Sequence, residues 1–112
     1  MIKDVCDEFE LRAVRSDETY GPGVIIADII NEISEAKFII AEVSEKNPNV
    51  FYEVGFAHAI RKPTILIAQK ETELPFDISP FRVLFYENTI GGKKKVEDRL
   101  RRHIEAILNS NI

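Results

Sequence analysis

"KFIIAEVSEKNPNVFYEVGFAHAIRKPTILIA", residues 37–68, is the stretch that decides the fold. It begins and ends with apolar runs, at 37–43 and 64–68. Both runs are short, continuous and rich in β-branched residues, which is typical of strands covered on both faces in a parallel sheet. The segment between them has the length and the apolar spacing of a helix. The stretch therefore predicts a strand, a crossover helix and a second strand parallel to the first.

The crossover helix has a start signal and a stop signal. Asn47 can cap free backbone N–H groups, and Pro48 fits the first helical position, where its missing N–H is not needed. The helix is expected to run to about Arg61, because Pro63 cannot continue it. Its predicted apolar stripe consists of Val50, Phe51, Val54, Phe56, Ala57 and Ile60.

The rest of the chain continues the alternation of helices and strands. The other predicted elements are a helix at 2–9, a strand at 11–15, a helix at 24–36, a strand at 82–87 and a helix after Gly91 and Gly92. The apolar side of the last helix carries Val96, Leu100, Ile104, Ile107 and Leu108. This alternation predicts an α/β fold with a mainly parallel sheet of about four strands and right-handed crossovers.

Composition indicates one domain, residues 1–112, with an ordinary soluble surface. The chain has 112 residues, of which 45% are apolar, and its formal charge is −4. An acidic balance excludes broad binding to nucleic acid or to an anionic membrane, which would need a basic excess. The single cysteine, Cys6, cannot form an internal disulfide, and the first ten residues carry charges where a signal peptide would be apolar. We therefore expect a cytoplasmic protein.

Glu53 is the residue that the packing pattern of the crossover helix does not require. It borders the apolar stripe, because Phe56 and Ala57 lie three and four residues further on. The helix dipole favours a carboxylate near the helix start, whereas partial burial raises its proton affinity. Such a carboxylate could stabilise or trap the oxocarbenium-like cation that forms when a bond at an anomeric carbon is cleaved. The alternative, which the spacing alone favours, is a polar boundary residue hydrogen-bonded near its own helix end.

Other polar residues are predicted to lie near Glu53. Ligands of open α/β sheets sit beyond the carboxyl ends of the strands. Asp17 follows the predicted strand at 11–15, and Glu42 lies near the end of the predicted strand at 37–43. Either acid could hold ribose hydroxyls or the leaving base. Tyr52 could donate a hydrogen bond into a pocket or act as an interface aromatic residue.

Several classes of site are not predicted. His58, His103 and Cys6 are scattered, so no metal site is expected, and "GPG" lacks the strand, spacing and lysine of a phosphate-binding loop. No cofactor is expected. His58 is interpreted as a packed or half-exposed histidine. A solvated helix face is the interpretation of the basic cluster Lys93, Lys94, Lys95, Arg99, Arg101 and Arg102.

The segment "IIAEVSEKNPNVFYEVGFAHAIRKPTILIA" resembles the nucleoside 2-deoxyribosyltransferase-like group, which shares a flavodoxin-like fold with TIR-like domains. The shared pattern is an apolar strand, Asn-Pro-Asn-Val, an aromatic pair, Glu, an apolar residue and Gly, and later Lys-Pro before the next strand. The resemblance extends more loosely through "VRSDE" and "PFDISPFRVLFYE". It implies a flavodoxin-like three-layer domain, with Glu53 as the catalytic glutamate and base or sugar contacts near Asp17 and Asn49.

The chain departs from this family at two places. Glu42 stands where the family has Asp, and the family's first strand and the loop after it have no counterpart here. We expect a start codon assigned too late, a rearranged sheet of four parallel strands, or a homodimer or higher oligomer that covers the missing position. The resemblance implies cleavage or transfer of the N-glycosidic bond of a nucleoside or nucleotide. The alternative is a non-catalytic nucleotide-sensing or self-associating module of the TIR-like kind.

Overall fold

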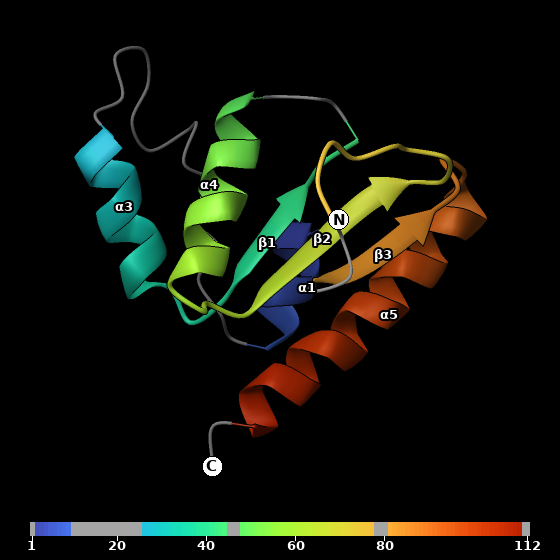
Figure 1. The fold of residues 1–112 in the computed structure, drawn as a ribbon. Coiled ribbons are helices and arrows are strands. Elements are labelled where there is room, and N and C mark those ends of the chain that lie inside the picture. The colour runs from blue at the N-terminus through green and yellow to red at the C-terminus, as the bar shows by residue number, and fades with distance from the viewer. Residues whose placement is uncertain (1, 10–25, 45–47, 78–80, 111–112) are drawn as a thin grey trace.

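A parallel sheet forms the centre of the computed structural model, which describes residues 2–9, 26–44, 48–77 and 81–110. Its strands in this part of the chain are β1 (Ile39–Glu42), β2 (Thr64–Gln69) and β3 (Arg82–Tyr86), in the order β1-β2-β3 (Figure 1). The register places Ile39 of β1 opposite Thr64 of β2, and Ile65 of β2 opposite Arg82 of β3. The parallel direction predicted from the two apolar runs is thus confirmed.

β2 is the central strand of the three, and its sequence reflects that position. Ile65, Leu66, Ile67 and Ala68 all have a relative exposure of 0%. Because a central parallel strand is covered by other elements on both faces, every position along it favours an apolar side chain. This explains why the run is continuous and does not alternate.

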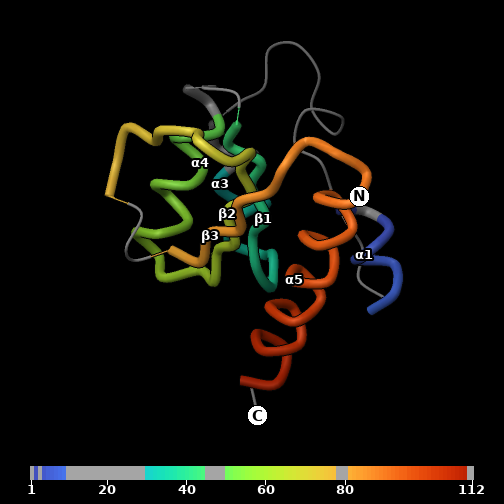
Figure 2. The backbone as a smooth tube through the Cα atoms, turned by 90° about the vertical axis from the view of Figure 1, so that its right-hand side faces the viewer, coloured from blue at the N-terminus to red at the C-terminus, as the bar shows by residue number. Residues whose placement is uncertain are grey.

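Helices cover both faces of the sheet (Figure 2). On one face lies α4 (Pro48–Ala59), with α3 (Ile26–Glu35) packed against it, and on the other lie α1 (Ile2–Glu8) and α5 (Ile90–Asn109). The core under α4 contains Ala41, Val43, Val54, Leu66 and Ala68. The larger core under α1 and α5 contains Val5, Ile65, Ile67, Leu84, Tyr86, Val96, Leu100, Ile104 and Ile107. The arrangement is compatible with a flavodoxin-like fold.

α4 begins at Pro48, as its sequence predicts, and ends in a left-handed turn. Arg61 has φ 61°, its N–H donates to the carbonyl of His58 at 3.0 Å, and the N–H of Lys62 donates to the carbonyl of Ala57 at 2.9 Å. These bonds satisfy carbonyls that the helix end would otherwise leave free. The Nζ of Lys62 also donates to the carbonyls of Ser34 and Ala36, at 2.9 and 2.7 Å, and so ties the end of α3 to the end of α4.

The connection from β2 to β3 has no helix in its described residues, 70–77 and 81. Leu74, Phe76 and Phe81 pack against the same core as α4 and cover the sheet where a crossover helix would otherwise lie. Phe76 makes edge-on contacts with Phe51 of α4, at 5.7 Å between ring centroids, and with Phe81, at 5.6 Å. Aromatic side chains thereby join this connection to α4.

α5 begins one residue before the glycine pair, so the predicted start after Gly91 and Gly92 is wrong. Thr89 is the N-cap, and its Oγ1 accepts a hydrogen bond from the N–H of Gly92 at 2.9 Å. A Cβ at Gly92 would clash with the carbonyl oxygen of Glu87, whereas nothing lies within 4 Å of a Cβ at Gly91. Gly92 therefore permits a close backbone approach inside the first turn and does not interrupt the helix.

The remaining predicted elements agree with the described residues to within two residues at each end. The predicted strand at 11–15 lies outside the described residues. The other three predicted strands are present in the described part of the chain. The prediction that Ile60 belongs to the buried stripe of α4 is wrong, since its relative exposure is 41%. Ile60 follows the last residue of α4 and no longer belongs to the helical stripe.

No helix in the described residues has the length and apolar character needed to cross a membrane.

Candidate functional site

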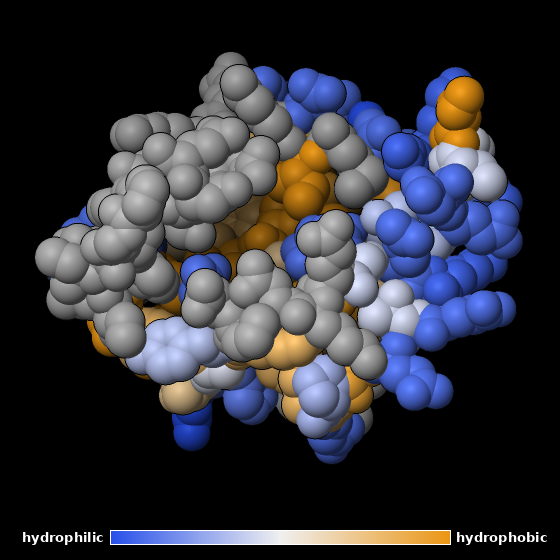
Figure 3. All heavy atoms as spheres, turned by 90° about the horizontal axis from the view of Figure 1, so that it is seen from above, coloured by the Kyte–Doolittle hydropathy of each residue, from blue (hydrophilic) through white to orange (hydrophobic). Residues whose placement is uncertain are grey.

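The carboxyl ends of the three strands meet at one edge of the sheet, and each strand ends on a polar residue. Glu42, Gln69 and Tyr86 are the last residues of β1, β2 and β3. α4 and α5 both begin on the side of this edge (Figure 1). Seen from above, apolar atoms of the described residues are visible near the centre of the molecule, with polar atoms to one side (Figure 3). The carboxyl edge is the edge at which open α/β sheets bind ligands.

Glu42 is held by two hydrogen bonds from within the chain. The Oη of Tyr86 donates to Oε2 of Glu42 at 3.0 Å, and the backbone N–H of Ser44 donates to Oε1 at 2.7 Å. Both carboxylate oxygens therefore accept a hydrogen bond. Glu42 is partly buried and Tyr86 is buried, so their contact is partly shielded from water.

Ser44 connects Glu42 to the end of β2. Its Oγ accepts a hydrogen bond from the backbone N–H of Gln69 at 2.7 Å. The backbone also joins the ends of β2 and β3, because the N–H of Lys70 donates to the carbonyl of Tyr86 at 2.8 Å. We call Glu42, Ser44, Gln69 and Tyr86 the strand-end network, since they join the carboxyl ends of all three strands.

The pKa of Tyr86 is raised above its ordinary value. Burial of the phenol is the largest cause, followed by the hydrogen bond to Glu42 and the negative charge of that carboxylate, while hydrogen bonds with the Ser44 and Gln69 side chains act in the opposite direction. A phenolate next to the Glu42 carboxylate would be unfavourable. Tyr86 is therefore protonated at neutral pH and serves as the hydrogen-bond donor to Glu42.

Glu42 and Glu53 lie on opposite sides of the sheet. Neighbouring residues of a strand point to opposite faces, and Ala41 belongs to the core under α4 whereas Ile40 packs against the core under α1 and α5. Glu42 shares the face of Ile40, and its contact with Tyr86 agrees with this. Glu53 belongs to α4, which covers the other face. The structure thus places Glu42 at the carboxyl edge and Glu53 on the helix that covers the opposite face, and it does not bring the two acids onto one face.

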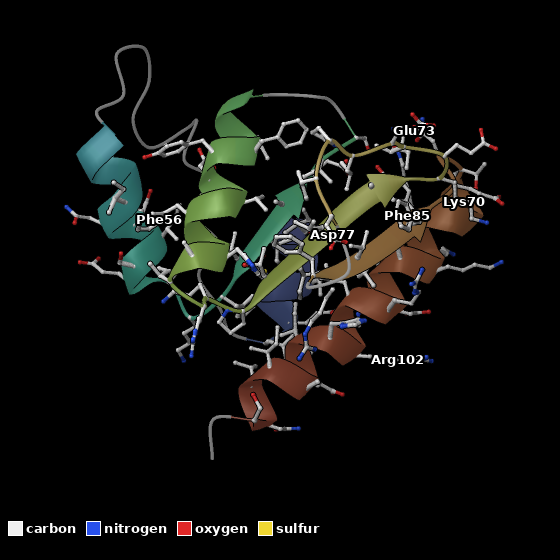
Figure 4. All side chains as sticks on the ribbon, in the orientation of Figure 1. Phe56, Lys70, Glu73, Asp77, Phe85 and Arg102 are labelled. Carbon is white, nitrogen blue, oxygen red and sulfur yellow. The ribbon has the colours of Figure 1, made fainter. Side chains whose placement is uncertain are left out.

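Glu53 is partly buried in the second turn of α4. Val54 and Ala57, which are buried, face the sheet. Phe56 lies one turn after Glu53 on the same flank of the helix, and Figure 4 shows Phe56 on the side of α4 that faces α3. The carboxylate therefore lies on the α3-facing flank of α4 and not beneath the helix.

The other predicted site residues are only partly described. Asp17 lies outside the described residues. Asn49 belongs to the first turn of α4, and Tyr52 is 49% exposed on the same helix, so their predicted contacts stay predictions. His58 is exposed, and its ring centroid lies 4.9 Å from that of Phe81, which agrees with a half-exposed histidine and not with a fully packed one. Among the described residues, no group of three or more His, Cys, Asp or Glu side chains could hold a metal ion.

Sequence reasoning missed Tyr86, Ser44 and Gln69. Tyr86 lies within the predicted strand at 82–87, where its spacing indicates no further role. The available signal was that a side chain able to form hydrogen bonds lies at or next to the end of each predicted strand, and that parallel strands bring such ends together.

Comparison with protein-family models finds no match to this chain, and comparison with curated proteins finds none either. Its function is therefore argued from the site.

Proposed function

We propose that the protein cleaves or transfers the N-glycosidic bond of a nucleoside or nucleotide, with Glu53 as the carboxylate that stabilises or traps the anomeric cation. The observation that carries the proposal is the position of Glu53, which is partly buried on the flank of a helix that begins at the carboxyl edge of a parallel sheet. Partial burial beside apolar groups strengthens the attraction between a carboxylate and a developing cation, because water screens the two charges less.

The sequence motif supports the same assignment, because Glu53 is the residue that matches the glutamate of the family it resembles. In this proposal Asp17, Asn49 and Tyr52 contact the base or the sugar. Glu42 has a different position from Glu53, since it contacts Tyr86 on the face of the sheet opposite α4. We therefore assign the bond-breaking step to Glu53 alone.

Release of free base tests the proposal directly. The protein is incubated with deoxynucleosides, nucleoside monophosphates and NAD, and free base is quantified by chromatography. We expect release from at least one class, and a decrease of at least about 100-fold in Glu53→Gln, because the amide cannot supply a negative charge. Glu35→Gln is the matched control, since Glu35 is an exposed acid on the neighbouring helix α3.

Two results would contradict the proposal. Equal activity in Glu53→Gln and Glu35→Gln would remove Glu53 from the reaction. Thermal stabilisation by a nucleotide without base release would instead favour the nucleotide-sensing alternative, because a ligand that binds only the folded state raises the melting temperature whether or not it reacts.

A further inference from the structure

The strand-end network contains a contact between two strands that are not neighbours. β2 lies between β1 and β3, yet the side chains of Glu42 and Tyr86 meet at 3.0 Å. Neighbouring strands are about 4.8 Å apart, so the two strands are separated by roughly 10 Å. Two long side chains on the same face are needed to span that distance. An aspartate at position 42 would be shorter by one methylene, which explains the use of glutamate here.

The network fixes the point at which the chain leaves β1. Ser44 takes part in two of its bonds, donating its N–H to Glu42 and accepting the N–H of Gln69 at its Oγ. In sequence, Ser44 is only four residues before Pro48, the first residue of α4. The position of Ser44 therefore limits how far the start of α4 can lie from the end of β1, because the three intervening residues span only a short distance.

We propose that Tyr86 is a positioning residue, which acts through Glu42 and Ser44 to set the start of α4 and thereby the place of Glu53. The effect on kcat rests on the proposed function. The positioning itself is tested separately, by amide hydrogen exchange. Tyr86 does not contact the reacting atoms, because its hydroxyl is bound to Glu42 on the face of the sheet opposite α4.

The position of Tyr86 suits this role. Its side chain is only 8% exposed and packs in the core under α1 and α5, which restricts its rotamers. No buried side-chain nitrogen or oxygen in the described residues lacks a hydrogen-bond partner, so the network is satisfied as it stands. Satisfied and buried polar groups hold one geometry, because any alternative leaves a group without its partner.

The test compares Tyr86→Phe, Glu42→Asp and the double variant. Tyr86→Phe removes the donor and keeps the ring, and Glu42→Asp keeps the charge but shortens the reach. We expect each variant to lower kcat for base release about tenfold with KM within about twofold, because a misplaced catalytic group affects the transition state more than ground-state binding. The double variant is expected to lose no more than either single variant, since both remove the same bond.

Val96→Ala is the matched control for lost stability. Val96 is fully buried in the same core, on α5, and has no part in the network. We expect it to lower the melting temperature and to retain the wild-type kcat well below that temperature. Loss of kcat in Val96→Ala equal to that in Tyr86→Phe would overturn the proposal, because general destabilisation would then explain both.

Amide hydrogen exchange measured by NMR gives the structural readout. In Tyr86→Phe and Glu42→Asp, exchange at Ser44, Gln69 and α4 is expected to be faster than the loss of global stability accounts for. If the wild-type protein releases no base, the proposed function fails, and this exchange still decides the positioning role. Unchanged exchange at Ser44 and α4, or an unchanged kcat alongside faster exchange, would overturn the inference.

Discussion

Gly92 and Gly91 make the sharpest comparison at the scale of single residues. A Cβ at Gly92 would clash with the carbonyl oxygen of Glu87, while the corresponding position at Gly91 is open. We expect Gly92→Ala to lower the free energy of unfolding by about 1–3 kcal/mol, because the first turn of α5 must shift. Gly91→Ala is expected to raise it by at most about 1 kcal/mol through helix propensity. Chemical denaturation of both variants measures the difference, and equal values would contradict the close approach.

Tyr86 should make stability depend on alkaline pH. Its pKa is raised mainly by burial and by Glu42, so the folded protein holds the phenolic proton more tightly than the unfolded chain. Tyr86 therefore contributes fully to the free energy of unfolding below its pKa in the unfolded chain, about 10. This contribution decreases as pH rises through the higher pKa of the folded protein. Urea unfolding across that range is expected to show a steeper decline in wild type than in Tyr86→Phe. Parallel declines would contradict the raised pKa.

At the scale of elements, the end of α4 offers a gain in stability. Arg61 adopts φ 61°, a left-handed conformation that a side chain makes unfavourable by about 1–2 kcal/mol. Arg61→Gly is expected to raise the free energy of unfolding by about 0.5–1 kcal/mol, since glycine loses more backbone entropy on folding and so offsets part of the relief. Arg61→Ala retains a Cβ and serves as the control. Equal unfolding free energies for the two variants in chemical denaturation would exclude backbone strain as the cause.

Elements with a local signal were predictable from the sequence. The apolar run of β2 and the proline at the start of α4 each depend on residues next to one another, so their positions follow from spacing. The start of α5 was not predictable in this way. Glycine pairs usually mark a break, and only the tertiary approach of Glu87 explains why one belongs inside the first turn.

The candidate site was predictable only in outline. The sequence places Glu42 at a strand end, and topology then assigns it to the carboxyl edge. It does not predict the face, because β1 has four residues and its apolar run shows no alternation. The contact with Tyr86 joins residues 44 positions apart across a third strand, so no local pattern contains it. Likewise, the flank of α4 that carries Glu53 acquires its surroundings only from the packing of α3.

The outer edge of β1 bears on the oligomeric state of the protein. Ile39 and Val43 donate their N–H groups toward β2, so the backbone groups of Ile40 and Glu42 point away from it. In the described residues, no strand pairs with that edge. The homodimer or higher oligomer expected from the sequence would place a strand of a second chain at this edge, since an unpaired edge strand favours pairing. Analytical ultracentrifugation should give at least twice the 12.8 kDa mass of one chain, and a monomer at every concentration would contradict this.

The packing of α1 against α5 joins two distant parts of the chain. Arg101 forms an ion pair with Glu8 at 2.6 Å across 93 residues, and Val5 is fully buried in the α5 core. A helix of seven residues is too short to be stable alone in water. During synthesis on the ribosome, α1 emerges long before the helix that it packs against. The β1–α4–β2 unit can form early from neighbouring residues, whereas α1 can pack only after α5 has been synthesised.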